Sequence, residues 1–267
     1  MIVITGVIAG VVAIFIVKPV EGYVDSSRRA ELTDVTDTAL RRIARDLHLA
    51  LPNSVRIPSD GSTQCFEFIP TSTGGRYRAQ CSTNPCPVGE DALDFSVADA
   101  TFNVLGGLNS TPASGDRVVI FNLGIAPADA YAGGNMATIT TPLSTSQITL
   151  GAAKLFPFES LGSRFHVISN TEQAVFYVCS GVGTDSAGNG TGTLYRFSQY
   201  GFNGAQPGAC PTPIATTPVL AKNLSACTFT YAPGATQRNA LVAMRLSATQ
   251  KNETAALYHE VHISNVP

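Results

Sequence analysis

Apolar residues at the start of the chain follow two different patterns. Residues 1–17 (MIVITGVIAGVVAIFIV) contain no charged residue, which is typical of a helix that lies in lipid. From residue 21 onward, apolar residues recur every three or four positions. This spacing predicts an amphipathic helix that places one face on a folded domain. The predicted apolar face consists of Leu32, Val35, Ala39, Ile43, Leu47 and Ala50.

We expect the two segments to form one long helix that extends to residue 51. Pro19 lacks an amide hydrogen and crowds the carbonyl four residues before it, so we expect a kink there rather than an end. Asp37 precedes Arg41 by four residues, the order that favours an ion pair within a helix. Pro52 ends the helix because a residue before proline avoids the helical conformation. The side chains expected to point away from the domain are Arg41, Arg42, Arg45 and Asp46.

Beyond Pro58 the chain consists of short alternating or apolar segments separated by Gly, Pro, Asn and Ser, which predict β-strands. The Gly74-Gly75 pair predicts a hairpin turn. Residues 124–146 show neither period and predict a long loop or subdomain, and residues 181–192 predict a flexible hairpin tip. The expected strands are residues 64–69, 92–95, 101–105, 117–123, 147–150, 164–168, 173–178, 193–197, 227–231, 241–246 and 255–263.

One helix followed by many strands predicts an α+β fold in which the helix packs across an antiparallel sheet. We divide the 267 residues into three parts: 1–17, the apolar half of the helix; 18–51, its amphipathic half; and 52–267, a β-rich globular domain. The net charge is −2 and no basic block occurs. This composition gives no indication of a nucleic-acid partner.

The chain contains an even number of cysteines, which predicts disulfides in an oxidising compartment. The nearest pair, Cys81 and Cys86, is the expected local disulfide, and Cys179 is expected to pair with Cys210 or Cys227. A zinc site is the alternative, but no second close Cys or His pair accompanies Cys81 and Cys86. The six candidates are Cys65, Cys81, Cys86, Cys179, Cys210 and Cys227.

No residue pattern predicts catalysis. His259 and His262 are three positions apart, whereas the zinc-protease motif HExxH places its histidines four apart on one helical face. In a strand this spacing sends them to opposite faces. Asp185 and Asn189 could bind calcium, but a solvated turn is the simpler interpretation. We therefore expect no enzyme activity, no cofactor, no metal and no small-molecule substrate.

An apolar half, a kink, an amphipathic half and a β-rich domain together resemble the plan of type IV pilins and pseudopilins. The segment ITGVIAGVV, with Gly6, resembles the interior of the pilin signature helix. The run RRAELTDVTDTALRRIARDLHLALPNSVRI and the terminal YHEVHISNVP resemble the O-type minor pseudopilins of the mannose-sensitive haemagglutinin (MSHA) pilus. The resemblance covers about the first 57 residues well, and the remainder only through strand pattern and terminus.

The resemblance implies a non-enzymatic minor pilin that initiates or caps a pilus. Such a subunit sits in the bacterial inner membrane with a periplasmic domain before it reaches the pilus or cell surface. The implied partners are the inner membrane, other minor and major pilins, and a prepilin peptidase that processes the precursor. Four small residues form a face on which helices can approach closely. They are Gly6, Ala9, Gly10 and Ala13.

The chain departs from the pilin pattern at its start. The basic leader, the Gly-Phe cleavage site and the glutamate that follows it in the family are all missing. We therefore expect the N-terminus to be truncated. Seventeen residues at about 1.5 Å each span roughly 25 Å, less than a hydrocarbon core of about 30 Å.

Three other functions fit parts of the sequence. One is a J-type minor pseudopilin of type II secretion, which shares the architecture. Another is a membrane-anchored adhesin whose binding surface is formed by residues 124–146 and 181–192. An anchored hydrolase is the third, and it needs a catalytic constellation that the sequence does not show.

Overall fold

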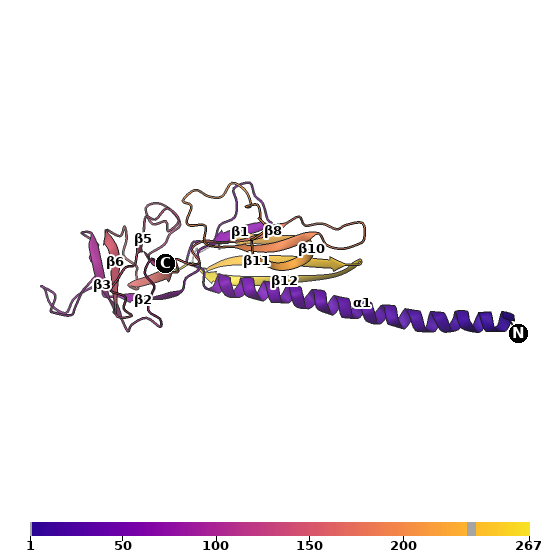
Figure 1. The fold of residues 1–267 in the computed structure, drawn as a ribbon. Coiled ribbons are helices and arrows are strands. Elements are labelled where there is room, and N and C mark those ends of the chain that lie inside the picture. The colour runs from indigo at the N-terminus through magenta and orange to yellow at the C-terminus, as the bar shows by residue number, and fades with distance from the viewer. Residues whose placement is uncertain (1, 234–238) are drawn as a thin grey trace.

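A single long helix precedes two β-sheets (Figure 1). The computed structural model describes the backbone of residues 2–233 and 239–267. Helix α1 (Ile2–His48) continues through Pro19 without a break. It therefore ends three residues before the expected end, and its last turn carries Arg45 and His48, cations that interact favourably with a helix C-terminus. Among the first 21 residues, the side chains described are those of Val3, Ile4, Gly6, Gly10, Val12 and Val20.

The first sheet packs against α1. Its strand order is β1-β8-β9-β10-β11-β12, and the neighbouring strands are antiparallel. The helix lies along β12 and β11, at one edge of this sheet (Figure 1). The strands are β1 (Cys65–Phe68), β8 (Val175–Ser180), β9 (Gly192–Phe197), β10 (Val219–Ala232), β11 (Asn239–Gln250) and β12 (Glu253–Ser264).

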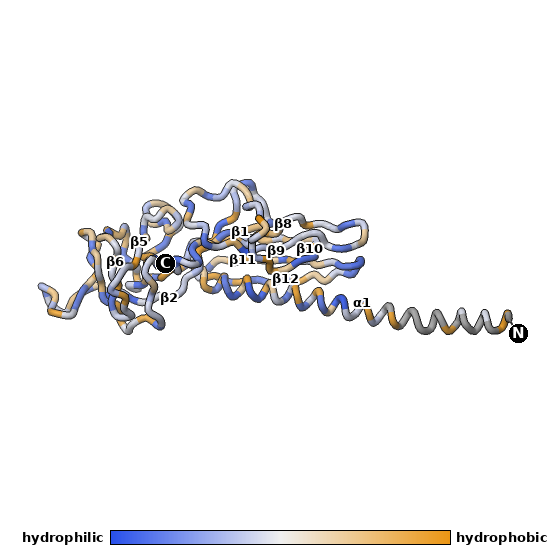
Figure 2. Tube along the Cα trace, in the orientation of Figure 1, coloured by the Kyte–Doolittle hydropathy of each residue, from blue (hydrophilic) through white to orange (hydrophobic). Residues whose placement is uncertain are grey.

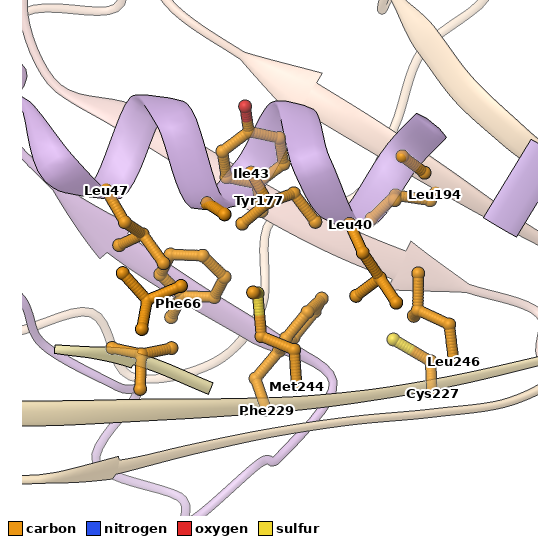
Figure 3. Packing of buried hydrophobic residues seen from close by; sticks show 14 of the residues in the cluster. Leu40, Ile43, Leu47, Phe66, Tyr177, Leu194, Cys227, Phe229, Met244 and Leu246 are labelled. Atoms are coloured by element: carbon orange, nitrogen blue, oxygen red, sulfur yellow. The ribbon is translucent and has the colours of Figure 1, made fainter. Parts of the chain in front are cut away.

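The helix buries one face in the core of the first sheet, which confirms an α+β fold with a helix on an antiparallel sheet. Figure 3 shows Leu40, Ile43 and Leu47 of α1 directed at side chains from five strands. Those strand residues are Phe66, Tyr177, Leu194, Cys227, Phe229, Met244 and Leu246. Because the core draws on strands far apart in the sequence, the position of α1 is fixed by the whole sheet.

The predicted helical face is correct except at Val35, which is 38% exposed, and Thr36 is buried in its place. The Thr36 hydroxyl donates to the Leu32 carbonyl at 2.7 Å, so its burial leaves no polar group unpaired. Asp46 also differs from expectation. It turns toward the sheet and accepts hydrogen bonds from Tyr177 at 2.6 Å and Arg196 at 3.1 Å. The expected Asp37–Arg41 ion pair is present at 2.6 Å.

The second sheet lies beyond the C-terminal end of α1 (Figure 1). Its strand order is β5-β4-β7-β2-β3-β6. The two edges meet, because Ile139 and Leu150 form an antiparallel bridge and the Thr140 amide donates to the Thr149 carbonyl at 2.9 Å. This sheet is therefore a small barrel. Its strands are β2 (Thr73–Tyr77), β3 (Asp99–Leu105), β4 (Arg117–Ile120), β5 (Met136–Thr138), β6 (Gln147–Lys154) and β7 (Arg164–Ile168).

The barrel is inserted into the first sheet between β1 and β8, which are paired neighbours. A separate apolar cluster that includes Leu51, Ile69 and Tyr131 lies at the junction of the two sheets. Asn53 also spans the junction, since its side-chain amide donates to the carbonyls of Asn122 at 2.8 Å and Asn265 at 3.2 Å. Buried side chains and hydrogen bonds therefore join the two sheets directly.

All six cysteines form disulfides. Cys81 pairs with Cys86 as expected. Cys179 pairs with Cys227, one of its two expected partners. Cys65 pairs with Cys210, which ties the loop after β9 to the start of β1. With every sulfur in a disulfide, none is left as a zinc ligand.

Two β predictions are wrong. Residues 73–77 form a barrel strand rather than a hairpin turn, and residues 92–95 contain no strand. Residues 124–146, expected to be a loop or subdomain, form a loop that contains the short strand β5. The remaining predicted strands all occur, and most are longer than predicted.

Candidate assembly surface

The N-terminal part of α1 projects beyond the first sheet (Figures 1 and 2). Arg29 forms an ion pair at 2.6 Å with Glu253, the first residue of β12, where α1 passes the end of the sheet. Among the described side chains, none from residues 2–28 forms a hydrogen bond or ion pair with the sheet. This projecting segment is about 40 Å long at about 1.5 Å per residue.

Apolar side chains on the projecting segment are open to solvent. Val3 is 78% exposed, Ile4 65%, Val12 48% and Val20 55%. Exposed apolar patches mark places where a protein meets another protein or a lipid, and these four side chains all lie on the projecting segment. No helix within the described part of the chain is long and apolar enough to cross a membrane.

The four small residues predicted to mediate helix packing lie in this projecting segment. A Cβ atom built on Gly6 or Gly10 would meet no heavy atom within 4 Å. Both glycines therefore lack a packing partner among the described residues. The side chains of Ala9 and Ala13 lie outside the described residues.

Where α1 packs on the sheet, its opposite face is exposed and charged. We call Glu31, Asp34, Thr38, Arg42 and Arg45 the outer stripe. All five are exposed, and their spacing places them on one side of the helix. The four charged members form no ion pair with any residue that the structure describes. The outward orientation predicted for Arg42 and Arg45 is confirmed, whereas apolar periodicity alone did not identify Glu31, Asp34 and Thr38 as members of the same face.

Residues 181–192 form the predicted hairpin tip between β8 and β9, and hydrogen bonds connect this tip to the sheet. The Asp185 carboxylate accepts from the amides of Ala187 at 2.9 Å and Asn189 at 2.8 Å. The hydrogen bond from the Asn189 amide is the main cause of a lowered pKa for Asp185. The Lys251 amide donates to the Asn189 side chain at 3.0 Å. The Asp185 carboxylate, which a calcium ion would need as a ligand, therefore already accepts hydrogen bonds from amides of the turn.

His259 and His262 lie on opposite faces of β12, and both are exposed. This arrangement agrees with the strand interpretation of the two histidines. Within the described part of the chain, no cluster of three His, Cys, Asp or Glu side chains could hold a metal ion.

A partly buried polar cluster joins α1 to the first sheet. Arg196 bridges Asp46 at 3.1 Å and Glu172 at 2.5 Å. Burial raises the pKa of Tyr177, which donates to the same Asp46, and the negative charge of Asp46 raises it further. These groups fix α1 on the sheet, and nothing in their geometry presents a reactive atom to solvent.

The far end of the barrel carries an open cleft of about 480 Å³. Leu93, Phe95, Asp94 and Glu159 contribute to its lining, beside the disulfide at Cys86. Figure 1 shows that the barrel lies at the opposite end of the molecule from the N-terminus. The cleft presents one aromatic ring and two carboxylates.

No protein-family model, curated protein or solved structure matches this chain.

Proposed function

We propose that this chain is a non-enzymatic minor pilin, or pseudopilin, of an MSHA-like type IV pilus. In this role it waits in the bacterial inner membrane with its β-rich domain in the periplasm, and then helps to initiate or cap the fibre. The observation that carries the proposal is the division of α1. The C-terminal part of α1 is fixed on the first sheet by the apolar core and by the ion pair between Asp46 and Arg196, whereas the N-terminal part projects with exposed apolar side chains.

A projecting apolar helix has two environments in which its surface is covered. Lipid covers it before assembly, and neighbouring helices cover it in a fibre. The apolar surface is buried in both environments, so the hydrophobic effect does not favour one over the other. The favourable free energy of assembly then comes from close packing between helices. We assign this packing to residues 3–17, with Gly6, Ala9, Gly10 and Ala13 as the face of closest approach.

The rigid attachment of α1 supports an assembling role over a simple membrane anchor. A tether needs only a flexible linker, whereas here the helix runs directly into the core at Leu32 without a break. Any position that the projecting segment takes therefore sets the position of the whole domain. The three disulfides support a periplasmic location. Other pilins and a prepilin peptidase are the partners in this proposal.

Gene deletion in the host, scored for surface pili, tests the function. Deletion should abolish or sharply reduce piliation, and the natural gene should restore it. Gly10→Leu should not restore pili because the larger side chain blocks close approach. Val12→Leu, which changes a residue on another side of the same segment, should restore them. Normal pili after deletion would overturn the proposal.

A J-type role in type II secretion is separated by a secretion assay on the same deletion strain. Lost secretion with normal pili would establish that role. The cleft at the far end of the barrel favours an adhesin as the second candidate, since it is displayed away from the membrane end. Normal pili with lost surface attachment would move the function to that cleft.

A further inference from the structure

The charges of the outer stripe have a regular order. Glu31 and Asp34 come first, and Arg42 and Arg45 follow. Each base is eleven residues after its acid, so that Glu31 corresponds to Arg42 and Asp34 to Arg45. Eleven residues are about three helical turns, so the four side chains project on the same side. An acidic patch and a basic patch of equal size therefore lie along one exposed helical face.

The two patches cannot neutralise each other within one chain. Eleven residues correspond to an axial separation of about 16 Å, beyond the reach of an ion pair. Nearby charges on α1 behave differently, since Asp37 pairs with Arg41 and Asp25 with Arg28. The outer stripe thus keeps four charges that no described residue pairs.

We propose that the outer stripe docks on the outer stripe of a second copy of this chain, with the helices parallel and displaced by eleven residues. Glu31 then faces Arg42 of the second copy, and Asp34 faces its Arg45. Parallel helices without displacement would place acid against acid and base against base, which is unfavourable. The charge order therefore selects the axial shift. The parallel orientation rests on the proposed function, because both helices enter one membrane from the same side.

The same displacement of eleven residues also brings complementary side chains together in the apolar part of α1. Ala13 precedes Glu31 by 18 residues, about five turns, so both positions lie on one face of a regular helix. A shift of eleven residues places positions 9 and 13 opposite Val20 and Val24 of the second copy. Val20 is 55% and Val24 43% exposed. Small positions thus meet larger apolar side chains, which permits close helix contact.

Cross-linking between two differently tagged full-length copies in a bacterial inner membrane tests the register. All six native cysteines are in disulfides, so Glu31→Cys in one copy and Arg42→Cys in the other supply the only free thiols. A short bis-maleimide should link this pair, and likewise Asp34→Cys with Arg45→Cys. Linking of Glu31→Cys with Arg45→Cys, but not with Arg42→Cys, would indicate antiparallel helices and overturn the proposal. Failure of every pair to link would overturn it too.

Charge reversal tests whether the four charges of the outer stripe set the register of the two helices. We expect Glu31→Arg with Asp34→Arg to lower about tenfold the yield of a neutral reporter cross-link between Ser27→Cys in one copy and Thr38→Cys in the other, which lie eleven residues apart and are exposed. Arg42→Glu with Arg45→Glu should do the same. The variant with all four reversals restores complementary charges and should regain the natural yield. A yield in the fourfold variant as low as in either double variant would show that the residues matter for another reason.

The two proposals fail separately. Abolished piliation on gene deletion together with normal yields in both double reversals would remove the stripe contact and keep the pilin function. Normal piliation on deletion, with the predicted cross-links still present, would remove the pilin function and leave a parallel self-association to be explained.

Discussion

Arg56 and Glu67 are joined in two ways: their side chains form an ion pair of 2.6 Å, and their backbones exchange two hydrogen bonds of 2.9 Å. Glu67 is only 1% exposed. It also accepts a hydrogen bond from Tyr200 at 2.7 Å, and the Arg56 guanidinium lies 3.5 Å from the centre of the Tyr131 ring. The segment that carries Arg56 thereby covers the outer edge of β1.

Removal of the Arg56 charge should destabilise the protein strongly. Arg56→Met leaves the Glu67 carboxylate buried without its cation, which costs about 3–5 kcal/mol. Urea unfolding of the full chain in detergent micelles, followed by circular dichroism, measures the loss. Arg41→Ala is the matched control, because it removes an exposed ion pair worth less than about 1 kcal/mol. Equal losses in the two variants would contradict the assignment of Glu67 as a charged buried group.

The disulfides should contribute unequally because they close loops of different length. Cys65 and Cys210 are 145 residues apart, whereas Cys81 and Cys86 are five apart. Constraint of the unfolded chain predicts that the longer loop contributes about 3 kcal/mol more. Paired Cys→Ala variants of each bridge, compared by thermal unfolding, provide the test. A larger effect from the Cys81–Cys86 bridge would refute the loop-length argument.

His166 on β7 should make stability depend on pH. Burial lowers its pKa from 6.5 to about 4, and the positive charge of Arg164 adds to the shift. The unfolded chain therefore binds a proton at a pH where the folded chain does not. Stability should be unaffected above about pH 6.5 and fall by up to about 3 kcal/mol as the pH decreases to 4.

The variant His166→Gln isolates this contribution, because carboxylates add their own pH dependence below about pH 5. The difference in unfolding free energy between the natural chain and His166→Gln should change between pH 6.5 and 4. Parallel profiles for the natural chain and His166→Gln would contradict a lowered pKa for the partly buried His166.

Gly190 should not tolerate a side chain. An added Cβ would lie 2.0 Å from the Asn223 carbonyl oxygen, so the backbone of β10 would have to move. We expect Gly190→Ala to cost about 1–3 kcal/mol, the usual range for overpacking. Gly208→Ala is the control because a Cβ there meets no atom within 4 Å. Hydrogen exchange at the Gly190 amide, which donates to the Thr249 carbonyl at 2.7 Å, reports the local disruption.

Local signals in the sequence located the helix and most strands. The apolar spacing around Ile43 and Leu47, the acid–base order at Asp37 and Arg41, and the short Cys81–Cys86 interval all describe contacts made within a few residues or one helical face. Residues 164–168 match β7 exactly. Each of these features is decided by neighbours in the sequence, which a pattern can detect.

The barrel was missed because contacts distant in the sequence decide it. Gly74 and Gly75 were interpreted as a turn, yet β2 needs them for a different reason. A Cβ on Gly74 would lie 2.9 Å from the Phe165 carbonyl oxygen, and one on Gly75 would lie 3.1 Å from the Leu108 side chain. Glycine here permits close packing of strands. Strand β5 has only three residues, too few to show an alternation.

The candidate assembly surface was predicted in part. A continuous uncharged run identified residues 1–17 as a segment that needs an apolar environment. Gly6 and Gly10 contact none of the described residues, so the proposed packing partners could not be identified from this sequence. The charge order of Glu31, Asp34, Arg42 and Arg45 is visible in the sequence, but its meaning depends on knowing that this face of α1 is exposed rather than buried against the sheet.

The place where the barrel joins the first sheet makes the molecule modular. Phe68 and Val175, at which the chain leaves and rejoins that sheet, are directly paired across β1 and β8. A few residues could close this gap as an ordinary hairpin, and α1 with its core would keep every strand that supports it. Evolution can therefore exchange or enlarge the distal barrel as a unit, and a foreign domain can be grafted there, without altering α1 or the strands that support it.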